Sequence, residues 1–128
     1  MTSEDSARRR IRDYKDLEVW QRAISLCKPV YTVTASFPKD ERFGLTSQIR
    51  KATVSVSANI AEGWGRGTRQ DYCRFVRIAR GSAAEVESEL MAARELGFVK
   101  PDQLSDIFDE ITAIRRMLQA LVRSLDAS

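Results

Sequence analysis

The chain has 128 residues, of which 43% are apolar and 30% are charged, and its formal net charge is +3. This length and composition are typical of one soluble globular domain. No apolar run approaches the ~20 residues that a membrane-spanning helix needs, and the N-terminus carries charge without the apolar segment of a signal peptide, so we expect a cytoplasmic protein with no membrane partner.

The start of the chain predicts a tail followed by a helix. Residues 1–13 contain four arginines and no helical pattern, and we expect a flexible basic tail there, with a single domain over residues 14–126. Helical periodicity begins near Asp16 and continues to Ser36. Pro29 lies inside this helix and predicts a kink, because proline lacks a backbone donor. Two apolar stripes lie side by side on the predicted helix: Leu17, Trp20, Ile24, Cys27 and Tyr31 form one, and Val19, Ala23, Leu26, Val30 and Val33 form the other.

The second predicted helix runs from Leu45 to Trp64 and ends at a cluster of glycines. Polar side chains interrupt its apolar stripe, although a buried amide or carboxylate costs free energy unless it is hydrogen-bonded. We therefore expect a specific partner near Asn59 and Glu62. The simpler interpretation is that these groups hydrogen-bond helix ends or Arg50 across the domain. The residues assigned to this structural polar cluster are Gln48, Asn59, Glu62 and Glu85.

Two further helices complete the domain. One begins at Thr68 or Arg69 and keeps an apolar repeat from Tyr72 to Gly97; Gly81 in its middle predicts close approach of a neighbouring backbone. The other follows Asp102 as N-cap, with a seam of Leu104, Ile107, Ile111, Ile114, Leu118, Leu121 and Leu125. No segment alternates as a strand would. Four helices with short connections predict an all-α, antiparallel up-down-up-down four-helix bundle.

The chain contains no histidine, which removes the usual metal ligand and the usual general base. Glu62, Glu85 and Glu89 resemble the carboxylates of a di-metal bundle, but that site also needs a Glu-x-x-His pair on two helices. We expect no catalytic residue, no cofactor and no metal, and hence no enzyme. A site made only of carboxylates is the alternative that would give a metal-dependent enzyme.

Basic residues gather in the middle of the chain. Residues 42–80 hold eight Lys or Arg against two acids, whereas residues 85–126 hold five against nine. Two interpretations remain open: a surface that binds RNA or DNA phosphates, or an interface with the acidic last helix of a neighbouring subunit. The candidate nucleic-acid-binding residues are Arg66, Arg69, Arg74, Arg77 and Arg80.

Several motifs together resemble a known family. They are Asp16-Leu-Glu-Val-Trp20-Gln-Arg-Ala23, Gly44-Leu-Thr-Ser-Gln48-Ile-Arg50, Ser57-Ala-Asn59-Ile-Ala-Glu62-Gly63 and Gly81-Ser82-Ala-Ala-Glu85. The chain is similar over residues 14–125 to small bacterial four-helix bundle proteins first noted in intervening sequences of large-subunit ribosomal RNA genes. More distantly, it resembles the accessory variability protein of diversity-generating retroelements.

The resemblance implies a homopentamer without established enzymatic activity, and the retroelement branch implies nucleic-acid binding through a positive surface. Together with the residues, it predicts a non-enzymatic oligomeric binding or scaffold protein that binds RNA or DNA through its arginines. The alternatives are a purely protein–protein assembly module with an unknown partner, or the carboxylate-metal enzyme.

Overall fold

The computed structural model describes residues 11–127, so the first ten of the thirteen residues predicted as a basic tail lie outside the described range. Four α-helices account for most of the described chain: α2 (Glu18–Thr34), α3 (Leu45–Gly65), α4 (Arg69–Glu95) and α5 (Pro101–Asp126). Short 3-10 turns, η1 (Tyr14–Asp16) and η2 (Lys39–Glu41), precede α2 and α3. No helix in residues 11–127 is both long and apolar enough to cross a membrane.

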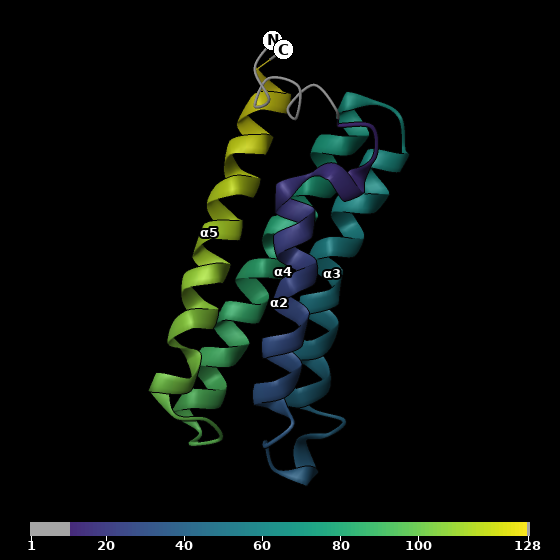
Figure 1. Cartoon of the computed structure of the whole chain (residues 1–128). Coiled ribbons are helices and arrows are strands. Elements are labelled where there is room, and N and C mark those ends of the chain that lie inside the picture. The colour runs from purple at the N-terminus through teal and green to yellow at the C-terminus, as the bar shows by residue number, and fades with distance from the viewer. Residues whose placement is uncertain (1–10, 128) are drawn as a thin grey trace.

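The helices form one antiparallel bundle (Figure 1). Each helix packs against its neighbour in the chain, and α5 closes the bundle against α2. Successive helices run in opposite directions because three residues join α3 to α4 and five join α4 to α5. The predicted all-α, up-down-up-down four-helix bundle is confirmed.

Each helix contributes one fully buried stripe to a single core. In α2 this is the second predicted stripe, from Val19 to Val33. The first stripe is only partly covered, since Ile24 and Tyr31 keep 43% and 38% of their surface exposed. In α5 the seam is buried as predicted from Leu104 to Leu118, but the next buried position is Val122. The buried position shifts from the predicted Leu121 to Val122 because a straight helix has 3.6 residues per turn and therefore drifts from the 3.5-residue repeat of the predicted seam.

The helix ends follow local chemistry. The Thr68 side chain accepts a hydrogen bond from the Asp71 backbone N–H (3.2 Å) and caps α4. At the other end of α4, Gly97 adopts φ +80°. The backbone N–H groups of Gly97 and Phe98 donate hydrogen bonds to carbonyl oxygens in the last turn of α4. The predicted cap at Asp102 is wrong: Lys100 is the N-cap, α5 begins at Pro101, and Asp102 lies inside its first turn. Helix α2 continues through the exposed Pro29 as far as Thr34.

The close backbone approach occurs at Gly63 and not at Gly81. A Cβ on Gly63 would lie 2.7 Å from the Phe75 Cβ and 3.2 Å from the Tyr72 carbonyl oxygen, so only glycine lets α3 and α4 meet there. The prediction for Gly81 is wrong within this chain, because no atom beyond its own stretch of helix lies within 4 Å of a Cβ placed on it. An exposed glycine in a helix interior costs about 1 kcal/mol relative to alanine.

Candidate nucleic-acid interface

Asn59 obtains its hydrogen bonds within the bundle. Its side-chain Nδ2 donates to both the carbonyl oxygen and the Oγ of Ser55, each at 2.8 Å. The Ser55 Oγ also lies 2.9 Å from the Ser82 Oγ on α4. The Nδ2 group of Asn59 therefore has its partners within α3 and needs no bound ligand.

The other members of the predicted polar cluster do not join Asn59. Glu62 is exposed and forms an ion pair with Arg66 one turn later, at 3.0 Å. Gln48 and Glu85 are exposed as well. The prediction of one cluster is wrong because these positions lie at the rim of the apolar stripe, where solvent can satisfy them. Arg50, the predicted alternative partner, instead donates to Thr34 Oγ1 and the Tyr31 carbonyl oxygen.

Two polar atoms on α4 are buried without a hydrogen-bond partner among the described residues: the Tyr72 hydroxyl and Glu89 Oε1. Burial raises the pKa of Tyr72 to about 12. Burial also raises the pKa of Glu89, and the neighbouring carboxylate of Glu85 raises it further. Within residues 11–127, no three Cys, Asp or Glu side chains gather as the ligands of a metal would.

The five predicted arginines, four on α4 and Arg66 just after α3, divide between two sides of the bundle. Arg66 and Arg74 both stack on the ring of Phe75, with guanidinium-to-centroid distances of 5.0 Å and 4.4 Å. Arg77 and Arg80 instead reach α5, where they bond to Asp126 and Gln119. Arg69 lies on the same side as Arg77. The structure thus brings Arg69, Arg77 and Arg80 together and separates Arg66 and Arg74 from them.

The second half of α5 supplies three more arginines to that side. A hollow of about 450 Å³ lies between α4 and α5, and four arginines line it together with Thr112, Gln119 and Ala120. Its arginines are Arg80 from α4 and Arg115, Arg116 and Arg123 from α5. Among residues 11–127, neither Arg116 nor Arg123 forms an ion pair, whereas Arg115 contacts Glu87 at 2.7 Å.

A second hollow of about 340 Å³ continues the line towards the start of α4, between Arg69 and Asp126. We call the two hollows together the α4–α5 groove. Six arginines and two carboxylates lie along it: Arg69, Arg77, Arg80, Arg115, Arg116, Arg123, Glu87 and Asp126.

Sequence reasoning missed the arginines of α5 because it treated the last helix as acidic. The acids in fact lie mainly in its first half, and the arginines in its second. The spacing along the sequence does predict a polar face on this helix. Intervals of four, three and four residues place on one face Thr112, Arg116, Gln119 and Arg123.

Comparison with known proteins identifies the family. A model of the 23S rRNA-intervening sequence protein family matches residues 15–120. The chain belongs to this family. A solved structure of a protein of unknown function from the S23 ribosomal protein family of Bacteroides thetaiotaomicron is similar, with a TM-score of 0.73 and 21% sequence identity over 82% of this chain and 98% of that one. At this identity the likeness shows the fold alone. A search of curated proteins finds no match.

The two cysteines of this intervening-sequence protein are free thiols. Cys73 lies at the wall of the α4–α5 groove, and its Sγ donates to Asp126 Oδ1 at 3.3 Å. Burial raises the pKa of Cys73, and the hydrogen bond to Asp126 raises it further. A thiol that stays protonated is a weak nucleophile, so Cys73 is not expected to react covalently. In the groove it acts as a hydrogen-bond donor to Asp126.

Proposed function

We propose that this 23S rRNA-intervening sequence protein is a non-enzymatic, homo-oligomeric binding protein that binds RNA or DNA phosphates in the α4–α5 groove. The observation that carries the proposal is the convergence of Arg80, Arg115, Arg116 and Arg123 on one hollow. These residues replace Arg66 and Arg74 of the sequence prediction, which stack on Phe75 on another side of α4.

The chemistry of the groove favours a ligand with several phosphates. Guanidinium groups donate in a planar fork that matches phosphate oxygens, and they remain charged at every physiological pH. The arginines follow the helix axes over the length of two hollows, so a chain of phosphates can contact them in succession. Such contacts fix a nucleic acid by its backbone and carry little base information.

A titration at two salt concentrations tests this proposal. Labelled single-stranded and structured RNA, and single-stranded and duplex DNA, would be titrated with protein at 50 mM and 200 mM salt, with fluorescence anisotropy as the readout. Affinity should fall steeply with salt, because each phosphate contact releases counterions. In Arg116→Ala/Arg123→Ala, the slope of log affinity against log salt should decrease in magnitude by about 2.

The matched control is Lys28→Ala/Lys100→Ala, which removes two exposed cations outside the groove. It loses the same net charge and should keep most of the salt slope. Absent or salt-insensitive binding, or equal losses in the two double variants, would reject nucleic-acid binding in the groove.

The partly exposed stripe of α2 supports the homo-oligomeric part of the proposal. Ile24 and Tyr31 leave apolar surface uncovered on a helix whose other stripe already fills the core. Exposed apolar patches mark protein interfaces. The family resemblance favours five subunits. Sedimentation equilibrium at micromolar concentration measures the assembly, and a monomer there would reject it while leaving nucleic-acid binding to the titration.

A further inference from the structure

An apolar groove lies between α2 and α3, and it shares no lining residue with the α4–α5 groove. Residues of α2, η2–α3 and α3 line a hollow of about 700 Å³. Its apolar surface comes from Tyr31, Phe43, Val54 and Ala58. Phe43 is the most exposed large apolar residue of the described chain, at 85%, and Val54 is 44% exposed. An aromatic ring left in water at a helix connection is a characteristic anchor of protein interfaces.

The rim of this α2–α3 groove is cationic. Arg42 stacks over the Phe43 ring at 4.7 Å, and Arg50 stacks over the Tyr31 ring at 4.5 Å. Lys51 completes the set, and no acidic residue lines the hollow. Among residues 11–127, none of these three cations forms an ion pair within 4 Å. A complementary surface therefore needs apolar side chains together with carboxylates.

The exposed face of α4 offers an apolar side chain, Ile78, and a carboxylate, Glu85, with Arg74 one turn before Ile78. Ile78, Gly81 and Glu85 follow one another at three and four residues and so lie on one face of the helix. Ile78 is 41% exposed, and Glu85 is exposed one turn beyond Gly81. Gly81 has open space where a Cβ would stand, so nothing in its own chain explains the glycine. A glycine at this position lets the backbone of a docked helix come close.

We propose that the α2–α3 groove of one copy receives the α4 face of a second copy, with Lys51 opposite the partner's Glu85. Lys51 and Glu85 are opposite in charge, and the exposed side chain of Ile78 can contact the apolar side chains of the groove. The groove and the α4 face are different surfaces of the chain, so the contact between two copies is head-to-tail. Each copy that joins the assembly still has one of the two surfaces free to bind a further copy. This inference rests on the homo-oligomeric part of the proposed function and is independent of nucleic-acid binding.

Charge reversal with rescue tests the pairing. Lys51→Glu, Glu85→Lys and the double variant would be compared with the native chain by sedimentation velocity over a concentration series. Each single reversal should weaken self-association at least tenfold, because it places like charges across the contact. The double variant restores opposite charges and should recover most of the affinity. Lys100→Glu, an exposed position just before α5 and outside both surfaces, should leave assembly unchanged.

A second variant tests the apolar contact without a change of charge. Phe43→Ser replaces a ring that is 85% exposed, so the fold should persist, as circular dichroism would show, while self-association falls at least tenfold. Unchanged assembly in Phe43→Ser, or a double reversal that does not recover, would overturn the proposed pairing. A native chain that is monomeric would overturn it together with the oligomeric proposal, whereas the salt titration would still report on the arginines of the α4–α5 groove.

Discussion

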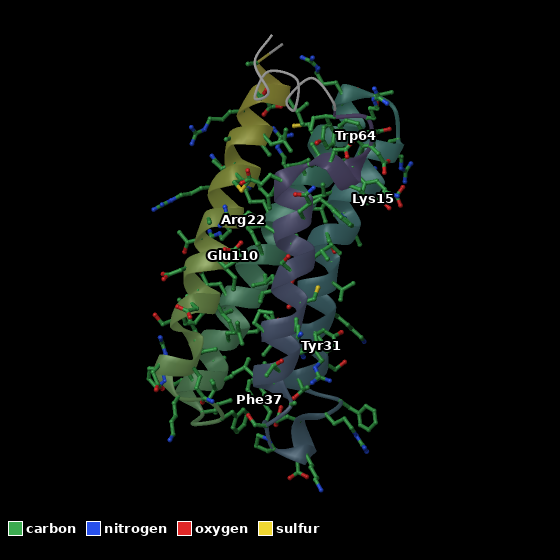
Figure 2. All side chains as sticks on the ribbon, viewed as in Figure 1. Lys15, Arg22, Tyr31, Phe37, Trp64 and Glu110 are labelled. Carbon is green, nitrogen blue, oxygen red and sulfur yellow. The ribbon has the colours of Figure 1, made fainter. Side chains whose placement is uncertain are left out.

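The guanidinium of Arg22 on α2 donates two hydrogen bonds to the carboxylate of Glu110 on α5, with Nε–Oε1 and Nη2–Oε2 distances of 2.7 Å and 2.8 Å (Figure 2). The pair joins the first and last helices of the bundle, which no loop connects. The hydrogen bond from Arg22 lowers the pKa of Glu110 below its usual value of 4.5. Both side chains are about one-third exposed, so solvent screens part of the attraction.

Glu110→Gln should lower the free energy of unfolding by about 0.5–1 kcal/mol at pH 7, because the charge-assisted pair is lost. Since the folded pKa is depressed, this stabilisation is present above pH 4.5 and disappears as the pH falls through the folded pKa. Urea unfolding of both proteins at neutral and acidic pH measures the difference. Glu18→Gln is the control: its exposed carboxylate lies 3.7 Å from Arg22 and should matter less. A pH-independent difference would contradict the ion-pair explanation.

Gly63→Ala should destabilise the bundle by about 1–3 kcal/mol, because the new methyl group would meet the Phe75 Cβ and the Tyr72 carbonyl oxygen. Gly81→Ala should instead stabilise the dilute chain by up to about 1 kcal/mol, since the position is open and alanine favours the helix. Thermal unfolding of the two variants compares the same chemical change at a tight and an open site. Equal shifts would show that the α3–α4 approach at Gly63 is looser than described.

Ile111→Asp should abolish folding under native conditions. Ile111 is fully buried in the centre of the α5 seam, and an aspartate there would be desolvated without a partner, at a cost above about 4 kcal/mol. Far-ultraviolet circular dichroism reports the loss of helix. Ser105→Asp, at an exposed position of the same helix, should retain the native spectrum. A folded Ile111→Asp protein would show that the seam tolerates a charge.

The sequence predicted the bundle well because the fold depends on apolar spacing, which is written along the chain. The stripes are buried as their periodicity predicts from Val76 to Ala93 in α4 and from Leu104 to Leu118 in α5, and Thr68 caps α4. Spacing does not say which of two adjacent stripes is covered. In α2 both stripes are apolar, and only the packing of α3 and α5 shows that the Ile24–Tyr31 side stays partly exposed.

The site was harder to predict because it combines two helices. Arg77 and Arg80 were identified, but their companions Arg116 and Arg123 lie more than thirty-five residues later in a helix that also carries acids. The net charge of a long segment is an average over the acidic first half and the basic second half of α5, so it does not reveal that the two charges lie at opposite ends of the helix. The partners of the polar residues of α3 were also hard to predict, because they are local: Asn59 bonds to its own helix, and Glu62 bonds to Arg66.

Glu89→Gln should raise the stability of the protein at neutral pH. Burial and the nearby Glu85 raise the pKa of Glu89, so the folded state favours the protonated carboxyl. The stability contributed by this group is complete below pH 4.5 and is lost as the pH rises through the folded pKa. The gain should be well below the ~1.4 kcal/mol that one pKa unit represents, because the side chain is only partly buried. Thermal unfolding at pH 4 and pH 7 measures it, and a gain that is larger at pH 4 would contradict the assigned direction.

If the α4–α5 groove binds nucleic acid as we propose, Asp126→Asn should strengthen that binding. Asp126 neutralises Arg77 at one end of the α4–α5 groove and accepts a hydrogen bond from Cys73. An amide at this position leaves the Arg77 guanidinium free for a phosphate, so the salt slope should steepen by up to about 1. Asp109→Asn makes the same change of charge at an exposed position of α5 outside the groove and should have a much smaller effect, because a general gain of charge is screened over distance. Anisotropy titrations at 50 mM and 200 mM salt compare the two variants. Equal gains would assign the effect to net charge and not to Arg77, and weaker binding by Asp126→Asn would show that the carboxylate holds the groove in its binding conformation.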